Sequence, residues 1–457
     1  MSSNPAQMIE EAALDRRDSY RRLIIMTRIP EVGRVKTRLI PALGPDGATA
    51  VHAALLDQTL RTADTHALQS GVDIEVRYTG GSTDAAETYR AGRAIRWREQ
   101  QGADLGERIH SAVQAACDEG ANAVLVIGTD CPDISPKILD AAWHSLKTAD
   151  VVLGPAEDGG YYLIGIKQPD RQLFAGIDWG TERVRDQTLA RCREQRKSVS
   201  QLPLLGDVDE AEDLIRCRRH LQGFDACLPT AIPGLISVVI PTLNEAHQLA
   251  ATVTPILEHS DCEVVIADGG SSDGTVELAQ QLECHVVRAN RGRGRQLNAG
   301  AALSRGELLL FLHADTKLPP TFRDEIRTTL DAGAVAGAFR FQVDLPGWGM
   351  RCVEWGTHLR AKYLQRPYGD QGLFLRAADF FSVGGYRNWP LMEDFELCSR
   401  LRKRGPIMIA PSAAITSGRR WKRLGAFKNT SINQCCIALY RLGVSVERIA
   451  QFYSKVR

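Results

Sequence analysis

Two apolar runs in the sequence end abruptly near an acidic residue. Leu308–Leu312 leads into His313 and Asp315, and Val124–Ile127 leads into Asp130. A carboxylate at the end of a buried strand can hold a divalent cation, which in turn can neutralise a diphosphate. Asp315 is therefore the first candidate metal ligand, and Asp130 is the second by analogy of position. The alternative is structural, because any strand that reaches the surface can end in this way.

Polar side chains also end two other apolar runs of the C-terminal half. The stretch SVVIPTLNE carries Thr242, Asn244 and Glu245, and VVIADGGSSDGT carries Asp268 before a turn. In open α/β sheets, ligands bind beyond the carboxyl ends of the strands, where loops and helix N-termini gather. Asp268 can accept hydrogen bonds from a base or a ribose there. Each piece alone also has a structural interpretation as a turn, a helix cap or a strand end.

The bulk properties are those of an ordinary globular protein with more than one domain. The chain has 457 residues, of which 44% are hydrophobic and 24% charged, and its formal net charge is +1. This length favours two or three domains, and the net charge gives no reason to expect nucleic acid as a partner. The 11 cysteines include no C-x-x-C pair, so a reducing cytoplasm is expected. We expect no transmembrane helix and no signal peptide, because no apolar run is long enough.

Strand and helix patterns alternate twice along the chain. In the first series we predict strands at 23–26, 74–78 and 123–127 and helices near 47–68 and 105–117; in the second, strands at 264–267 and 308–312 and a helix at 276–282. Between them, GFDACLPTAIPG has two prolines, two glycines and no periodicity, which indicates a linker. The alternation predicts an α/β protein in which each domain is a mostly parallel sheet flanked by helices. The predicted parts are a leader at 1–20, a domain at 21–224, a linker at 225–235 and a domain at 236–457.

Six motifs of the C-terminal half occur in the order found in one known enzyme family. They are ISVVIPTLNEA, IADGGSSDGT, NRGRGRQLNAG, FLHADT, GDQGLF and MEDFELCSRLRKRG. Together they resemble the family 2 glycosyltransferases with the GT-A fold, in particular a bacterial subgroup associated with arsenosugar biosynthesis. The resemblance covers about Leu235–Arg420. It implies inverting transfer of a sugar from a nucleotide-sugar donor, with Mg²⁺ or Mn²⁺ as the metal.

The resemblance also implies roles for particular residues. In such enzymes an acid deprotonates the acceptor, and this role maps onto Glu393 and Asp394, with Asp394 as the base. A positioned base contributes about 10²–10⁴ in rate. The alternative for Asp394 is a first-turn acid that the helix dipole favours. The expected donor-binding residues are Pro241, Thr242, Asn244, Glu245, Asp268, Gly269, Arg293, Arg295, Asn298, His313, Gly369, Asp370, Gln371, Arg420 and Trp421.

The chain departs from the family's pattern at the metal motif. Where the family has two acids separated by one residue, this chain has His313, Ala314 and Asp315. His313 can be a second metal ligand or can contact the nucleotide. In the third interpretation, Asp315 and the diphosphate alone hold the metal.

Two basic stretches each allow two interpretations. NRGRGRQLN places Arg291, Arg293 and Arg295 among glycines, either as a flexible loop over the substrate or as a solvated surface loop. SGRRWKRLGAFK gathers cations around Trp421. The resemblance suggests that this stretch grips a diphosphate, whereas the alternative is contact with an anionic membrane surface that holds a lipid acceptor.

The N-terminal half carries three further candidate stretches. Two basic residues after the opening strand suit a phosphate-binding loop, although the stretch is not a Walker A motif. The stretches VIGTDCPDIS and LGPAEDGGYYLIGI offer acids, the second beside a glycine pair that lets a ligand approach the backbone closely. The candidate site residues of this half are Lys36, Arg38, Asp130, Asp133, Asp158, Gly159 and Gly160.

These stretches, together with LPLLGDVDEAEDL, resemble a bacterial family with a nucleotide-diphospho-sugar transferase fold. That family is distantly similar to molybdopterin and other cofactor nucleotidyltransferases, and the likeness spans about Arg22–Leu221. PEVGRVKTRL stands where the nucleotidyltransferases have a Gly-Gly-rich loop with an arginine. This departure weighs against nucleotidyl transfer.

We therefore expect two tandem GT-A-like domains, with glycosyl transfer to a hydroxyl or carboxyl in the C-terminal half and a second transferase of the same pathway in the N-terminal half. In the alternatives, the N-terminal half is a nucleotidyltransferase that makes the donor, or a non-catalytic nucleotide-binding scaffold. The expected partners are a nucleotide-sugar donor and a small-molecule or lipid acceptor. The expected location is the cytoplasm, with peripheral contact at the inner face of the cell membrane as a further alternative.

Overall fold

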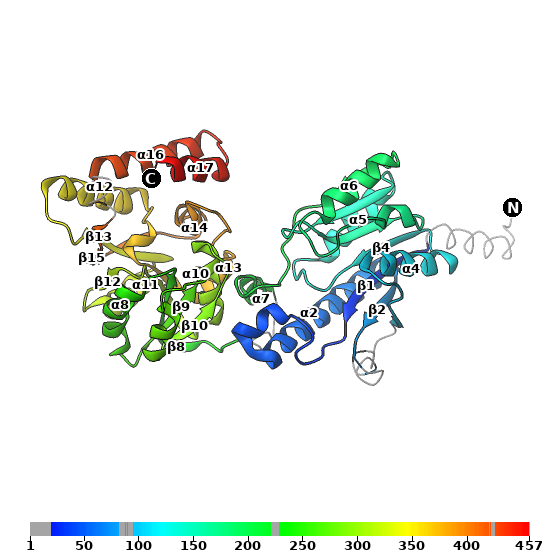
Figure 1. Cartoon of the computed structure of the whole chain (residues 1–457), viewed down its shortest axis with the longest axis horizontal. Helices are drawn as coiled ribbons and strands as arrows, with labels where there is room; N and C mark the ends of the chain where they lie inside the picture. The colour runs from blue at the N-terminus through cyan, green and yellow to red at the C-terminus, as the bar shows by residue number, and fades with distance from the viewer. Residues whose placement is uncertain are drawn as a thin grey trace, which may run out of the picture. The chain divides into compact units, whose positions relative to one another are not determined.

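The structure is a computed structural model that describes residues 20–81, 87, 89, 95–220, 228–419, 421 and 426–456. The predicted leader, apart from Tyr20, lies outside these residues, as does the predicted donor-binding residue Arg420. The chain divides into two compact units, Met1–Asp209 and Glu210–Arg457 (Figure 1). Within the described parts of the chain, no helix is long and apolar enough to cross a membrane.

The first unit is built on a seven-stranded sheet. Its strands are β1 (Arg21–Arg28), β2 (Asp73–Thr79), β3 (Arg96–Glu99), β4 (Ala123–Ile127), β5 (Val151–Pro155), β6 (Tyr161–Ile166) and β7 (Val199–Gln201). Its helices are η1 (Thr37–Leu39), α2 (Ile40–Ser70), α4 (Leu105–Asp118), α5 (Pro136–Leu146), η2 (Arg171–Phe174) and α6 (Val184–Glu194). The predicted elements of this half are present, and the helix predicted near 47–68 is the regular part of α2 that follows a break at Gly44.

Local sequence explains why these elements form. Along β1, Leu23 and Ile25 join the apolar core on one face of the sheet while Ile24 and Met26 join the core on the other, as the alternation of a doubly covered strand requires. Asp104 caps the N-terminus of α4. Its carboxylate accepts a hydrogen bond from the N–H of Glu107, the third residue of the helix, at 2.8 Å. Its apolar residues recur at helical spacing and pack on the same sheet.

The second unit is built on an eight-stranded sheet. Its strands are β8 (Ile232–Thr242), β9 (Cys262–Asp268), β10 (His285–Arg288), β11 (Gly306–Phe311), β12 (Thr316–Lys317), β13 (Ala336–Val343), β14 (Leu373–Arg376) and β15 (Ile407–Thr416). Its helices are η3 (Ala211–Asp213), α7 (Leu214–His220), α8 (Ala246–Leu257), α9 (Thr275–Gln281), α10 (Arg293–Leu303), α11 (Phe322–Asp331), α12 (Trp348–Leu364), η5 (Gly369–Gln371), α13 (Ala377–Ser382), α14 (Glu393–Leu401), α16 (Ala426–Arg441) and α17 (Val446–Val456).

The two sheets share one topology. Their strand orders are β3-β2-β1-β4-β6-β5-β7 and β10-β9-β8-β11-β14-β13-β15-β12, so the second repeats the first and adds β12 at one end. The directions also agree: β6 and β14 run antiparallel to both neighbours, and the remaining corresponding pairs are parallel. The predicted fold class, two tandem GT-A-like domains with mostly parallel sheets flanked by helices, is confirmed.

The division between the units lies upstream of the predicted linker at 225–235. Short elements η3 and α7 pack against α10, and Arg218 donates to the Ala302 carbonyl at 3.1 Å. Strand β8 already begins at Ile232, which pairs with Gly306 of β11. The end of the predicted N-terminal domain therefore packs on the second unit, and the end of the predicted linker is part of a strand.

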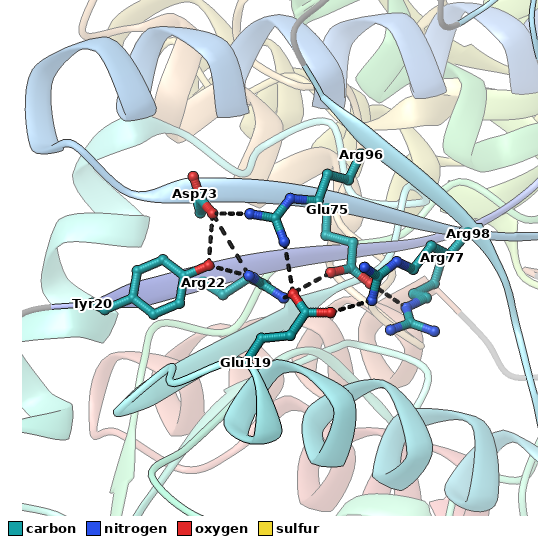
Figure 2. Close-up of polar contacts among 8 residues, drawn as sticks. All are labelled: Tyr20, Arg22, Asp73, Glu75, Arg77, Arg96, Arg98 and Glu119. Carbon is teal, nitrogen blue, oxygen red and sulfur yellow. Dashed lines mark hydrogen bonds and ion pairs between the residues drawn. The ribbon is translucent and has the colours of Figure 1, made fainter. Parts of the chain in front are cut away.

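A buried charge cluster joins β1, β2 and β3 to the C-terminal end of α4 (Figure 2). Arg22 is fully buried and donates to Glu75 at 3.0 Å and to Glu119 at 2.7 Å. Glu119 also accepts hydrogen bonds from Arg96 at 2.7 Å and from Arg98 at 2.5 Å. The cluster is completed by Tyr20, Asp73 and Arg77. Because a buried guanidinium is stable only when acids pair with it, the cluster fixes how α4 meets the sheet.

The pKa of Glu119 reflects these contacts. Partial burial opposes its ionisation, but hydrogen bonds from Arg22 and Arg98 outweigh that effect and lower the pKa from 4.5 to about 2. A carboxylate with a lowered pKa in the folded state stabilises the fold above its unfolded pKa, and this contribution disappears as the pH falls through the folded value. The contribution of Glu119 to the stability of the fold is therefore lost as the pH falls from 4.5 to about 2.

We expect Glu119→Gln to destabilise the first unit by about 1–3 kcal/mol at neutral pH, because it removes a charged acceptor from buried Arg22. Urea unfolding of the full chain, followed by circular dichroism, measures the change. The matched control is Glu194→Gln, since Glu194 is 62% exposed and pairs with Arg191 on the same helix. It should change stability by less than about 0.5 kcal/mol. Equal losses in the two variants would contradict the assigned role of Glu119.

Candidate functional site

Three parallel strands of the second unit bring the predicted strand-end residues to one edge of the sheet. The neighbours β9, β8 and β11 run in the same direction, so their C-terminal ends meet. Pro241 and Thr242 close β8, with Thr242 directly opposite Asp268 of β9. His313 and Asp315 follow β11. This is the edge at which open α/β sheets bind ligands.

Asp268 and Asn244 shape the loop that follows β9. Asp268 is 2% exposed, and its carboxylate accepts hydrogen bonds from the N–H groups of Gly270 and Ser271, both at 2.9 Å, and from Thr242 Oγ1 at 3.2 Å. Asn244 has a left-handed φ of 59° and donates from its N–H to Ser271 Oγ at 2.9 Å. Recognition of a base or ribose by Asp268 would require some of these bonds to open.

Three other predicted donor-binding residues also make interior contacts. Asn298 forms two hydrogen bonds with the backbone of Tyr386, at 2.8 and 2.9 Å. Gln371 is fully buried and donates to a main-chain carbonyl of β13 at 3.0 Å. A Cβ on Gly269 would lie 2.9 Å from the side chain of Gln296, so glycine allows that close approach. All three position the surrounding backbone.

The basic segment that was predicted to be a loop is the first turn of a helix. Helix α10 begins at Arg293, which donates to Glu393 at 2.9 Å. Arg295 donates to Asn388 at 2.7 Å. Both loop interpretations are therefore wrong for these two arginines, because the helix and its polar partners hold them.

Asp394 and Glu393 form a buried acid pair in the first turn of α14. Glu393 is 3% exposed and Asp394 is 9% exposed. Asp394 accepts a hydrogen bond from the Gly369 N–H at 3.0 Å. Burial and the charge of Glu393 raise the pKa of Asp394 to about 7, although Arg293 and Gly369 act in the opposite direction. A carboxyl with such a pKa can accept a proton near neutral pH.

His313 and Asp394 converge on Gly369. A Cβ on Gly369 would lie 2.6 Å from Asp394 Oδ2 and 3.0 Å from His313 Nε2. The imidazole of His313 and the carboxylate of Asp394 therefore both lie beside Gly369. Asp370 lies in η5 beside these groups, and Trp421 packs near Phe341 with 6.3 Å between ring centroids.

Two acids at the same strand-end edge share one guanidinium. Arg419 lies 3.5 Å from Asp315 and 3.6 Å from Glu245, measured between charged atoms. It also contacts His247 at 2.9 Å and Gln248 at 3.0 Å. The acids are partly exposed, with side-chain exposures of 24% for Asp315 and 30% for Glu245.

This acid pair fits a divalent cation of the Mg²⁺ or Mn²⁺ type when a ligand supplies further oxygens. Asp315 and Glu245 converge on a cation, and carboxylate oxygens are the ligands that such metals prefer. Across the described residues, no group of three or more His, Cys, Asp or Glu could hold a metal alone. A metal held by Asp315 and Glu245 would compete with Arg419 for the same two carboxylates.

The first unit has a cavity of about 590 Å³ where β1 and β4 end. Of the residues predicted for this site, it is lined by Lys36, Arg38, Asp130, Asp158 and Gly160. The lining does not include Asp133 or Gly159. Gly159 instead allows a close backbone approach, since a Cβ there would lie 2.2 Å from the Glu182 carbonyl.

Lys36 is the central cation of this cavity. Its side chain is 6% exposed, and its Nζ lies 2.5 Å from Asp130 and 2.9 Å from Asp209. Burial opposes its charge, but the two acids outweigh burial and raise the pKa of Lys36 well above its usual value. Lys36 in turn lowers the pKa of Asp130 against the effect of desolvation. Asp130, the predicted metal ligand, is therefore paired with the buried ammonium group of Lys36.

Sequence reasoning missed several residues of this cavity. They are Arg28, Arg34, His52, Arg108, Asp207 and Asp209. The two aspartates could have been found from the alternating acids of GDVD, since a backbone bond from Val208 to the Asp130 carbonyl at 3.0 Å holds that segment beside β4. The arginines and His52 are ordinary in their local sequence.

Two protein families match parts of the chain. Residues 62–181 match the family described as "Uncharacterized protein conserved in bacteria (DUF2064)". Residues 237–375 match the family "Glycosyl transferase family 2". Each match lies within one of the two units.

Three known proteins are similar to parts of the chain. An uncharacterized glycosyltransferase from Nostoc sp. (strain PCC 7120) is 34% identical over 111 residues, which cover 22% of this chain and only 34% of that protein. A solved "putative nucleotide-diphospho-sugar transferase" from Desulfovibrio desulfuricans G20 is 35% identical with a TM-score of 0.41, over 44% of this chain and 87% of that one. A mannosyltransferase from Pyrobaculum calidifontis, solved with GDP-Man and Mn²⁺, is 18% identical with a TM-score of 0.33, over 45% of this chain and 64% of that one.

We expect substitutions at Asp315 and Arg419 to have opposite effects on Mn²⁺ binding. Asp315→Asn removes a ligand and should abolish it, whereas Arg419→Gln removes a competing cation and should strengthen it by roughly 3- to 10-fold. Titration with Mn²⁺ in the presence of UDP, followed by electron paramagnetic resonance, measures both. Weaker binding in Arg419→Gln would mean that Arg419 supports the bound metal.

We expect Lys36→Met to remove nucleoside diphosphate binding from the first unit, because the neighbouring acids would then repel the ligand. Calorimetric titration of the full chain and of the variant with a panel of nucleoside diphosphates measures the number of binding events in each. Lys147→Met changes an exposed lysine and is the matched control. Unchanged stoichiometry in a folded Lys36→Met variant would contradict the role of Lys36.

Proposed function

We propose that this chain, which joins a DUF2064 domain to a glycosyl transferase family 2 domain, is a glycosyltransferase whose second unit transfers a sugar from a nucleotide-sugar donor to an acceptor hydroxyl with inversion. The observation that carries the proposal is the buried Asp394, whose pKa is raised towards neutrality beside Glu393 and whose carboxylate is oriented by Gly369. The proposed acceptor group is narrower than the hydroxyl or carboxyl expected from the sequence, since a carboxyl acceptor would need no base.

The proposed reaction is a single displacement. The acceptor oxygen attacks the anomeric carbon while Asp394 takes the hydroxyl proton. The bond between the anomeric carbon and the diphosphate breaks, and its electron pair leaves with the nucleoside diphosphate. Because the attacking oxygen enters opposite the leaving group, the configuration inverts.

Asp315 and Glu245 are the residues that would hold the metal. A bound Mg²⁺ or Mn²⁺ would neutralise charge on the leaving diphosphate. Glu393 forms an ion pair with Arg293 at 2.9 Å, and burial together with the charge of Glu393 raises the pKa of Asp394. Asp268 and Asn244 hold the loop at the edge where the donor would lie.

For the first unit we propose nucleotide-sugar binding as a second transferase of the same class. Lys36, Arg34 and Arg38 line one cavity with Asp158 and Gly160, a combination that suits a diphosphate and the hydroxyls of a sugar. Incubation with a nucleoside triphosphate and a sugar phosphate tests the nucleotidyltransferase alternative. Release of pyrophosphate that is lost in Lys36→Met would assign nucleotidyl transfer to this unit instead.

We expect Asp394→Asn to keep donor binding while transfer falls by about 10²–10⁴. Water can replace the acceptor, so release of nucleoside diphosphate from a panel of nucleotide sugars measures the rate, and calorimetry measures donor affinity. Asp324→Asn, at an exposed acid of α11, is the matched control. Donor affinity that falls in step with the rate would argue against a base.

The acid limb of the pH–rate profile should lie near neutrality. A base works only when ionised, and the raised pKa of Asp394 means that activity falls as the pH drops below about 7. An ordinary aspartate would remain ionised until about pH 4. A wild-type rate that is constant from pH 8 to about pH 5 would contradict this assignment.

A further inference from the structure

The second unit contains a separate cavity of about 410 Å³ beside the acid pair. Residues of α12, α14 and α16 line it, together with the segment between α12 and η5, and α12 packs against α16 (Figure 1). The lining includes Phe395, the residue after Asp394, and Tyr368, the residue before Gly369. Asp394 itself is not among the lining residues, but its neighbour Phe395 is, so the cavity borders the first turn of α14. Asp315 and Arg419 are not among its lining residues.

Three arginines line this cavity without an acid to balance them. Arg360, Arg366 and Arg441 form no ion pair with any carboxylate of the described residues. The guanidinium of Arg360 lies over the Tyr368 ring at 3.5 Å, and that of Arg366 lies over the Phe395 ring at 4.4 Å. Rings that face the guanidinium planes hold them in place, and Arg360 Nε donates to the Arg366 carbonyl at 3.2 Å.

Some of these N–H groups are buried and lack an acceptor. Arg360 Nη2 and Arg366 Nε have no hydrogen-bond partner among the described residues and no exposure to solvent. Leaving such a group unsatisfied costs about 1–3 kcal/mol. Burial, and the neighbouring charges of Arg402 and Arg441, lower the pKa of Arg366 from its usual value. One bound anion would accept hydrogen bonds from the unsatisfied N–H groups and would also reduce the repulsion between the neighbouring positive charges.

We propose that this cavity binds the acceptor, and that the acceptor carries a phosphate monoester close to the hydroxyl that is deprotonated. This inference rests on the proposed function, because it assigns the substrate of the same base. A phosphate monoester matches the site because its oxygens can accept from several guanidinium edges at once, and its two negative charges suit three cations. The remaining lining, which includes Val353, Leu364 and Ile437, suits the apolar part of the molecule.

The phosphate can belong to a soluble metabolite or to a lipid headgroup. Helix α12 contributes to the cavity and also exposes Trp348, Trp355 and Tyr363, at 76%, 68% and 70%. Glycerol 3-phosphate and lysophosphatidic acid carry the same phosphate and neighbouring hydroxyl, one in solution and one in a vesicle. They therefore separate the two sources without a change in headgroup chemistry.

The test is binding of these two probes and of inorganic phosphate to the full chain. We expect at least one probe to bind, and Arg366→Gln and Arg360→Gln to weaken that binding by about tenfold or more. Arg351→Gln, at a 70% exposed arginine of α12 outside the cavity, should have no effect. Binding of glycerol 3-phosphate indicates a soluble acceptor, and binding of lysophosphatidic acid vesicles alone indicates a lipid.

Two further measurements keep this proposal separate from the proposed function. UDP binding and circular dichroism should be unchanged in Arg366→Gln and Arg360→Gln, which shows that the variants are folded. Absence of binding by all three probes, or binding that both variants retain, would overturn the phosphate proposal. Donor hydrolysis that depends on Asp394 would still stand in that case. Loss of Asp394 dependence with arginine-dependent phosphate binding would instead overturn the proposed base and leave an anion site.

Discussion

A charged group held near the end of a buried strand is costly unless an opposite charge lies beside it, and both units meet that constraint with their own side chains. In the first unit, Lys36 lies between Asp130 and Asp209. In the second, Arg419 lies between Asp315 and Glu245. The repeated strand order places an acid at the same edge of each sheet, and each unit neutralises it with a cation from a different part of its sequence. The same rule explains the arginine and glutamate cluster that joins α4 to the first sheet.

Two features of the second unit do not follow this rule, and they lie together. Burial raises the pKa of Asp394, and Arg293, which forms its ion pair with Glu393, offsets this effect only in part. Among the residues that the structure describes, no carboxylate pairs with the three arginines of the neighbouring cavity. Unbalanced charges of this kind lower the stability of the fold. They occur mostly at functional sites, where a bound substrate or a proton balances the charge. The acid is negative when ionised and the arginines are positive. This arrangement suits a molecule that places a hydroxyl beside the acid and an anionic group beside the arginines.

The fold was largely predictable from the sequence, whereas the partners within the site were not. Runs such as Leu308–Leu312 and the turns after them predict strands and their ends, because burial and chain reversal leave local signals. The cations depend on tertiary structure: Lys36 and Asp209 are 173 residues apart, and Arg293 and Glu393 are 100 apart. For the same reason the sequence did not predict that Asp268, Asn298 and Gln371 form hydrogen bonds with the backbone around the site, and their contact with the donor stays a prediction.

If the second unit binds a metal as proposed, the guanidinium of Arg419 makes metal loading an ion exchange. One monovalent cation leaves Asp315 and Glu245 when a divalent cation arrives, so the net charge of the site rises by a single unit, and the released guanidinium becomes available to an anion. Metal and diphosphate would then enter most favourably as one complex, since its negative charge offsets the positive charge that accumulates at this edge. The empty enzyme would accordingly hold free metal weakly, and the nucleotide would act as the carrier that brings it in.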